Sequence, residues 1–228
     1  MKITYITFFL FLSLILFGCG NKSQKSIDCE ENITKALECR DNYFFYNAPE
    51  YLDSALVYLN EIKGRCKDQD NLVDGHMATI YFLKGDFKKA VKFYENLDAS
   101  EFSFPEYKTV IVNKIKAKEA KTKGKIELEK EYYSFIIRDM ESYLNRHYAQ
   151  RDSILSLHDM LLLNPEELQI GAVFGELYFY KVKLEGADKA TKELDSLQKA
   201  INGNDDYFNF LKKSIAGENG YRMSVTFE

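Results

Sequence analysis

The chain has 228 residues, a length that fits one domain or two small ones. Hydrophobic residues make up 46% and charged residues 29%, which excludes an intrinsically disordered chain, and the 3 Pro and 12 Gly exclude collagen-like or many-turned β architectures. The formal charge is −4, and because phosphate binding requires a net basic surface, we expect no nucleic-acid partner.

The first expected element is an apolar run over residues 3–17, preceded by Lys2. It is shorter than the roughly 20 residues that span a bilayer as a helix, and this layout is typical of a secretory signal. Leu16-Phe17-Gly18-Cys19 resembles the lipobox of bacterial lipoproteins. The resemblance implies cleavage before Cys19, diacylation of its thiol, typically with palmitate, and acylation of the new N-terminus. We therefore expect a lipoprotein signal peptide at 1–18, and a lipidated cysteine with a polar tether at 19–27.

Residues 28–216 carry helical patterns nearly throughout, so the predicted fold class is all-α. Asp28 and Glu31 have the spacing of a capping box. Pro49, Pro105 and Pro165 mark helix starts, because a missing N–H costs nothing at the first helical position. The expected helices are 28–47, 49–63, 70–84, 86–98, 105–123, 125–148, 152–163, 165–184, 186–201 and 204–215. Helices joined by such short turns predict stacked antiparallel hairpins.

The second hairpin carries the most informative spacing, Ala78-x2-Tyr81-x3-Gly85-x-Phe87-x2-Ala90-x3-Tyr94, which resembles the tetratricopeptide (TPR) signature. The alanines would let two helices approach closely, the glycine would form the turn, and the rings would fill the space between hairpins. Weaker versions of the spacing occur 35 residues earlier, 39 residues later, and around Gly175 and Ala190. A period near 34 residues is typical of a helical solenoid. The resemblance, over residues 37–200, implies a short TPR-like α-α superhelix; an unrelated α-helical bundle is the alternative.

In the TPR family, the first helix of each hairpin lines a concave groove. Carried over by register, the groove-facing positions would be Arg40, Phe44, Asn47, Thr79, Phe82, Lys114, Lys118 and Lys121. The three lysines belong to a basic cluster between residues 108 and 125, so they would form a basic stripe beside two aromatic rings. Such a stripe suits an acidic or carboxylate-ended peptide. A solvated helix face and a contact with anionic lipid headgroups are the alternatives.

Three cysteines remain in the exported chain, so at most one internal disulfide can form. In the TPR-like arrangement, Cys39 is expected near the start of the outgoing helix of the first hairpin, and Cys66 just beyond the end of the returning helix. Cys29 is ten residues from Cys39, or about 15 Å along a helix axis. We therefore predict the pairing Cys39–Cys66.

No residues in the sequence have the spacing of a known catalytic or metal site. The chain has no Gly-rich phosphate loop and no His or Cys pair at metal-ligand spacing. Ser156-Leu157-His158-Asp159 joins three residue types of a catalytic triad, but neighbours on a helix point in different directions. We predict no catalytic residue, no metal and no cofactor.

The last residues, 217–228, depart from the helical pattern. Tyr221, Met223, Val225 and Phe227 alternate with polar residues, which is the period of a strand. We expect an extended C-terminal tail, either packed on the last helices or added to the sheet of a partner.

These observations predict a lipid-anchored protein of the bacterial cell envelope that binds another envelope protein or peptide and is not an enzyme. Because Gly20 rather than Asp follows Cys19, the lipoprotein resemblance favours the outer membrane, facing the periplasm. A helical solute- or glycan-binding lipoprotein, favoured by 17 Phe and 16 Tyr, is the first alternative. An enzyme without a recognisable motif is the second.

Overall fold

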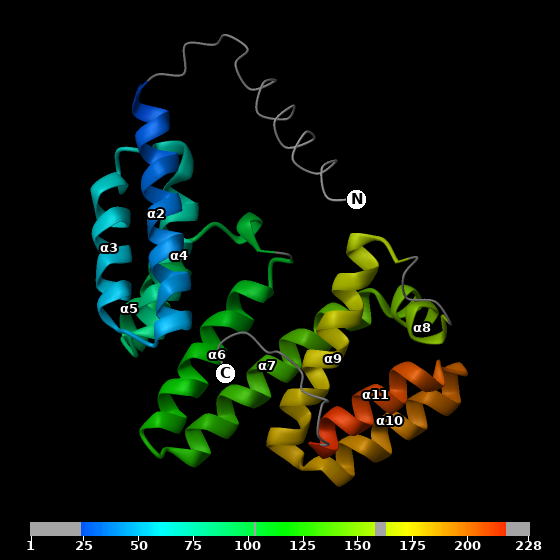
Figure 1. Cartoon of the computed structure of the whole chain (residues 1–228). Helices are drawn as coiled ribbons and strands as arrows, with labels where there is room; N and C mark the ends of the chain where they lie inside the picture. The colour runs from blue at the N-terminus through cyan, green and yellow to red at the C-terminus, as the bar shows by residue number, and fades with distance from the viewer. Residues whose placement is uncertain (1–23, 103, 158–162, 218–228) are drawn as a thin grey trace, which may run out of the picture. The chain divides into compact units, whose positions relative to one another are not determined.

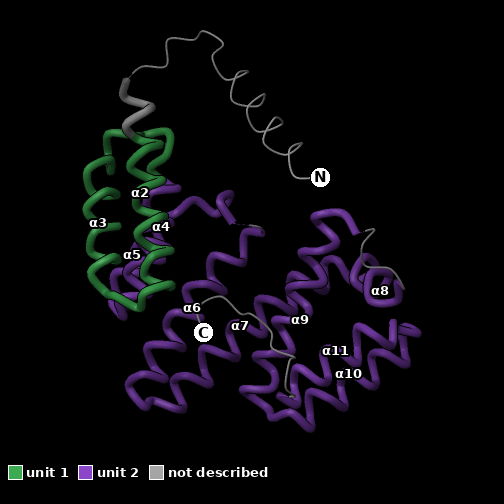
Figure 2. Tube along the Cα trace, in the orientation of Figure 1, with its two compact units in different colours: residues 1–70 green, residues 71–228 purple. Residues whose placement is uncertain are grey.

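The computed structural model describes residues 24–102, 104–157 and 163–217. Within these ranges every regular element is a helix and no strand occurs, which confirms the all-α prediction. The expected signal peptide, the lipobox and the tail after Gly217 lie outside the described residues. The chain divides into two compact units, unit 1 (residues 1–70) and unit 2 (residues 71–228), which are shown in Figure 2.

Unit 1 is a two-helix hairpin of α2 (Gln24–Tyr46) and α3 (Glu50–Ile62), followed by the short 3-10 helix η1 (Lys67–Gln69) (Figure 1). Helix α2 begins four residues before the expected start at Asp28, which shortens the expected tether. It ends at Tyr46, and the φ of 51° at the next residue, Asn47, lies in the left-handed region. Apolar side chains at helical spacing from both helices are buried: Ile33, Ala36, Leu52, Ala55, Leu56, Leu59 and Ile62.

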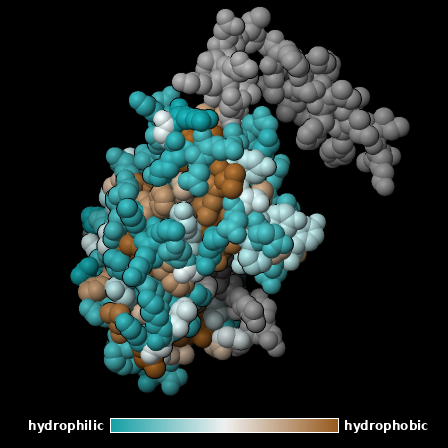
Figure 3. Space-filling view, turned by 90° about the vertical axis from the view of Figure 1, so that its left-hand side faces the viewer, coloured by the Kyte–Doolittle hydropathy of each residue, from teal (hydrophilic) through white to brown (hydrophobic). Residues whose placement is uncertain are grey.

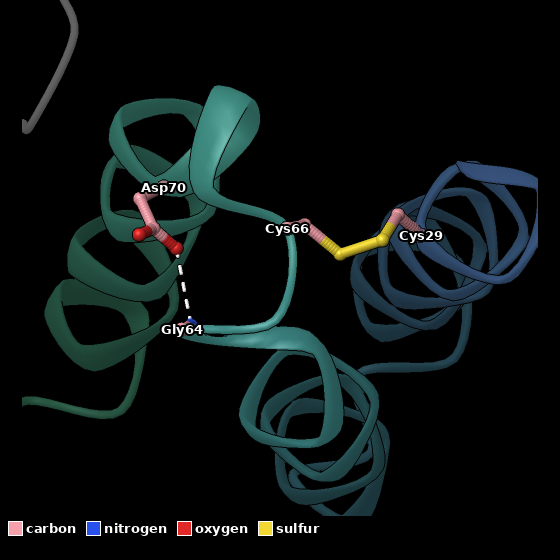
Figure 4. Close-up of a disulfide and its surroundings, with 4 residues drawn as sticks. All are labelled: Cys29, Gly64, Cys66 and Asp70. Atoms are coloured by element: carbon pink, nitrogen blue, oxygen red, sulfur yellow. Dashed lines mark hydrogen bonds between the residues drawn. A yellow bond between two sulfur atoms is a disulfide. The ribbon is translucent and has the colours of Figure 1, made fainter. Parts of the chain in front are cut away.

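A disulfide joins Cys29 to Cys66, with the two Cα atoms 6.2 Å apart (Figure 4). The predicted pairing Cys39–Cys66 is therefore wrong, and Cys39 has a free thiol. In an antiparallel hairpin, residues face each other when they are equally far from the turn. Cys29 lies 19 positions before Ala48 and Cys66 lies 18 after it, whereas Cys39 lies only nine before it. The prediction failed because it placed Cys39 near the start of a helix that begins at Gln24.

The loop that carries Cys66 is held by local hydrogen bonds. The Gly64 N–H donates to Asp70 Oδ1 at 3.1 Å, as Figure 4 shows. The Gln69 N–H donates to the Cys66 carbonyl at 2.8 Å. These bonds satisfy backbone groups beyond the end of α3. Cys66 therefore lies in a hydrogen-bonded loop when it bonds to Cys29 of α2.

Unit 2 contains the remaining helices that the structure describes. They are α4 (Asp70–Leu83, of which Asp70 still belongs to unit 1), α5 (Phe87–Asn96), the 3-10 helix η2 (Ala99–Glu101), α6 (Tyr107–Thr122), α7 (Ile126–Arg146), α8 (Tyr148–Ser156), α9 (Pro165–Glu185), α10 (Ala187–Ile201) and α11 (Asp205–Ala216). The predicted ends of these helices fall within two residues of the observed ones, except for α8. That helix was expected at 152–163, but it begins directly after His147.

The α4–α5 hairpin has the local geometry that its spacing predicts. Ala78 and Ala90 are completely buried between the helices. Gly85 takes a φ of 76°, which a residue with a Cβ rarely adopts, and the next N–H, of Asp86, donates to the Tyr81 carbonyl at 2.9 Å. The same turn recurs 39 residues later, where Gly124 has a φ of 66°. The turn glycine of the predicted repeat therefore has the same role in two hairpins.

In the described part of unit 2, apolar side chains are buried in a smaller and a larger cluster. The smaller cluster joins α4, α5 and α6 through Ala78, Ala90, Tyr94, Leu97, Ile111, Val112 and Ile115. The larger cluster runs from Phe104 to Leu211 and includes the fully buried Phe174, Tyr180 and Phe208. Both clusters take side chains from α6, so this helix is covered on more than one side.

The disulfide makes a direct prediction. Cys66→Ser should lower the free energy of unfolding by about 2–4 kcal/mol, because the bridge closes 37 residues of sequence and restricts the unfolded chain. Urea unfolding followed by circular dichroism measures this change, with Cys39→Ser as the matched control that should leave stability nearly unchanged. A cross-linked peptide containing Cys39 in a non-reducing digest would contradict the assignment.

Candidate functional site

The eight residues predicted to line a groove are divided between the two units. Unit 1 holds Arg40, Phe44 and Asn47, and unit 2 holds Thr79, Phe82, Lys114, Lys118 and Lys121. The surroundings of each side chain decide which of them can contact a partner.

In unit 1, Phe44 and Asn47 are exposed and Arg40 is half-buried. Arg40 forms an ion pair with its neighbour Asp41 at 2.8 Å, so its charge is balanced locally. Asn47 forms the end of α2, where its N–H donates to the Tyr43 carbonyl at 2.8 Å. Phe44 is 63% exposed and is available for contact.

In unit 2, the two predicted residues of α4 are engaged in packing. The Thr79 and Tyr94 hydroxyls are hydrogen-bonded at 3.1 Å, and burial raises the pKa of Tyr94. The Phe82 ring packs edge-on against Phe87, with centroids 5.8 Å apart. Both side chains therefore contribute to the α4–α5 hairpin itself.

Lys114 does not line a surface, so its prediction as a groove residue is wrong. Its side chain is completely buried in an ion pair with Glu176 of α9. Lys114 Nζ also donates to the Tyr107 hydroxyl at 3.1 Å, and that hydroxyl donates to Glu176 Oε2 at 3.3 Å. Residues 110–115 are all buried, so the middle of α6 has no solvent face on which a basic stripe could lie.

The Lys114–Glu176–Tyr107 cluster links the start and middle of α6 to α9. Lys114 Nζ lies 4.7 Å from the centre of the Tyr107 ring, which adds a cation–π contact. Burial and the neighbouring Glu176 carboxylate raise the pKa of Tyr107, so its phenol stays protonated and remains a donor. Removing one partner of such a buried pair would leave an uncompensated charge in the interior.

The exposed lysines gather at the turn between α6 and α7. Lys121, Lys123 and Lys125 are exposed there beside Ile126, which is 60% exposed, while Lys118 is half-buried one turn earlier. Lys123 pairs with Glu119 on its own helix. Of the three lysines predicted to line the groove, Lys121 is therefore the exposed one.

Among the described residues, three exposed aromatic side chains follow one another at the end of α2, beside the turn of the unit 1 hairpin. We call Phe44, Phe45 and Tyr46 the aromatic tip; they are 63%, 84% and 68% exposed. The Tyr46 ring stacks on Tyr51 of α3, with centroids 5.9 Å apart. The sequence singled out only Phe44, although consecutive aromatic residues on one helical turn cannot all face a core.

Other polar side chains of the described residues bond within one helix or between helices, as Lys181 does with Glu141 at 2.9 Å. An open pocket between α10 and α11 is lined by side chains that bond each other, such as Gln198 to Asp205 at 2.7 Å and Lys212 to Gln198 at 2.8 Å. No group of His, Cys, Asp or Glu side chains among the described residues is arranged to hold a metal ion. Figure 3 shows one side of the molecule as a mostly hydrophilic surface with separate apolar patches.

None of the helices in the described part of the chain has the length and hydropathy of a membrane span. No protein-family model matches the chain, and no curated protein or solved structure is significantly similar to it.

The buried ion pair generates a testable prediction. Glu176→Leu should lower the free energy of unfolding by about 3–5 kcal/mol, because Lys114 then stays buried without its carboxylate. The double variant Lys114→Met, Glu176→Leu should recover most of that loss, since apolar side chains fill the same space. A double-mutant cycle in urea measures the coupling, and Lys121→Met at the exposed end of α6 is the control. Additive losses would show that the two side chains do not interact.

The buried tyrosines predict a loss of stability in alkali. Burial raises the pKa of Tyr178 to about 12, and burial also raises that of Tyr207. Because these folded-state values exceed the usual value near 10, the stabilisation is complete below about pH 10 and is lost as the pH rises toward 12. Urea unfolding across that range should show this decline, and the effect should shrink in Tyr178→Phe. Titration of all tyrosines together near pH 10, followed by tyrosinate absorbance, would contradict the prediction.

Proposed function

We propose that this chain is a lipid-anchored interaction protein of the bacterial cell envelope, whose helical hairpins bind another protein or peptide. The lipobox resemblance at Leu16–Cys19 supports the anchor. The Cys29–Cys66 disulfide is consistent with this location, because structural disulfides persist in oxidising compartments such as the periplasm. On the same resemblance, the outer membrane facing the periplasm is the proposed location.

The observation that carries this proposal is the aromatic tip of unit 1. Aromatic residues are enriched at protein interfaces, where a ring gives a large contact area at little entropic cost. The tip lies at one end of the hairpin, and the disulfide links the two chain segments at the opposite end. The hairpin that carries the tip is therefore held together covalently. Such an arrangement suits passive docking of a partner.

A short TPR-like stack is the architecture that we propose for the hairpins. The buried alanines of α4–α5 and the repeated glycine turns at Gly85 and Gly124 support it. In this proposal each hairpin contributes a rigid face, and specificity comes from the side chains displayed rather than from a moving part. The exposed lysines at the α6–α7 turn are the surface that an acidic peptide would contact.

The anchor would act by raising the local concentration of the module at the membrane surface. Helix α2 has 23 residues, so it is about 35 Å long. The aromatic tip occupies the last three residues of α2, at the end farther from Gln24. The tip can therefore reach a partner a helix length away from the point of attachment.

Lipidation is tested by metabolic labelling with a palmitate analogue in a bacterial host. The wild-type chain should incorporate the label and sediment with membranes, whereas Cys19→Ser should lose the label and move to the soluble fraction. Equal labelling of the wild type and Cys19→Ser would remove the anchor from the proposal.

Partner binding is tested by cross-linking in the native envelope. We expect a cross-linked partner that is lost when Phe44, Phe45 and Tyr46 are changed together to Ser. Tyr148→Ser is the matched control, because Tyr148 on α8 is an aromatic side chain with the same 63% exposure as Phe44. A partner retained by the triple variant would move the contact away from the tip.

A further inference from the structure

We infer that the aromatic tip of unit 1 recognises an arginine-bearing segment of a protein partner. This inference rests on the proposed function and specifies the chemistry of the partner that the same surface would take. It is carried by three features of the hairpin end: the exposed rings, the acidic residues that flank them in the sequence, and an internal example of the contact elsewhere in the chain.

The exposed apolar area at the tip is large for so few residues. Phe44, Phe45 and Tyr46 are 63%, 84% and 68% exposed. With about 150–250 Å² per aromatic side chain, these fractions leave roughly 400 Å² of aromatic surface in contact with water. Patches of that size on a monomer are often binding sites.

Acidic residues flank this surface in the sequence. Glu50 and Asp53 lie after the rings in the first turn of α3, while Asp41, before the rings on α2, is paired with Arg40 at 2.8 Å. All three are exposed. Between residues 38 and 54 there are four acidic residues and one basic residue, Arg40, so the net charge is −3. The hairpin end therefore attracts cations and presents ring faces to them.

Arginine fits this combination better than lysine does. A guanidinium group can stack flat on an aromatic ring while its N–H groups bind a carboxylate. Unit 2 shows that a cation over a ring can also pair with a carboxylate: the Arg138 guanidinium carbon lies 5.2 Å from the centre of the Phe135 ring, and Lys89 Nζ lies 4.9 Å from the centre of the Tyr81 ring. The same Arg138 forms an ion pair with Asp139 at 2.9 Å. At the tip, the ring and the carboxylates would be supplied by this chain and the arginine by the partner.

The charge of the tip also argues against a membrane surface as its occupant. Exposed aromatic residues can insert among lipid headgroups, but membrane-binding surfaces of proteins usually pair them with lysine and arginine. Here Glu50 and Asp53 would face anionic headgroups with like charge. We therefore assign the tip to a protein segment.

The test measures binding of labelled peptides to the purified full-length lipoprotein in non-ionic detergent by fluorescence anisotropy. The probe is a short peptide that alternates arginine and leucine, with lysine-for-arginine and glutamate-for-arginine versions as controls. We expect the arginine peptide to bind most tightly, the lysine version more weakly, and the glutamate version not at all. Phe45→Ala with Tyr46→Ala should weaken binding of the arginine peptide about tenfold.

Two further variants separate the contributions. Glu50→Gln with Asp53→Asn should weaken binding and reduce its dependence on salt, because these carboxylates supply the electrostatic attraction. Tyr148→Ala should bind the arginine peptide as the wild type does. All substituted side chains are exposed, so circular dichroism and thermal unfolding should show unchanged folding for every variant.

Several results would overturn the inference. These are equal binding of the arginine and glutamate peptides, binding that persists in the ring variant, binding only to vesicles of phosphatidylglycerol and phosphatidylethanolamine, or self-association that depends on the tip. If the tip-dependent cross-linked partner is found but the arginine peptide does not bind, only the assigned chemistry fails. If no partner depends on the tip in the envelope, the proposed function fails as well.

Discussion

Helix α6 is the constraint on which unit 2 depends, because side chains from this one helix enter both buried clusters. Ile111, Val112 and Ile115 pack with α4 and α5, and Val110 and Ala117 belong to the larger cluster. A helix covered in this way has no room for an unpaired charge. Lys114 is accommodated because Glu176 and Tyr107 supply a carboxylate and a hydroxyl at its ammonium group. The Lys114 charge, which was predicted to belong to a binding surface, instead connects α6 to α9.

In unit 1 the corresponding constraint is covalent. Two helices bury few apolar side chains, and small cores commonly need a disulfide to reach adequate stability. The bridge between Cys29 and Cys66 closes one end of the hairpin, and the aromatic tip occupies the other.

Much of the helical structure could be predicted from local patterns. Helix α9 begins at Pro165 behind Asn164, and the capping box with Glu167 forms as the sequence indicates. Gly85 and Gly124 end helices because a left-handed φ is needed there. The disulfide was predicted wrongly, since its pairing depends on which residues lie equally far from the turn of the hairpin, and the prediction placed Cys39 rather than Cys29 near the start of the first helix.

The sequence by itself determined the helices of this protein. Helical periodicity, caps and glycine turns act within a few residues, so they can be recognised without knowledge of the tertiary structure. Only the tertiary structure decided which side of each helix is covered. Lys114 and Lys121 have the same chemistry and lie two turns apart on one helix, yet the first is buried against Glu176 and the second is exposed. Burial of a side chain depends on which distant segments of the chain pack against it. The residue types and their spacing along one helix do not contain that information.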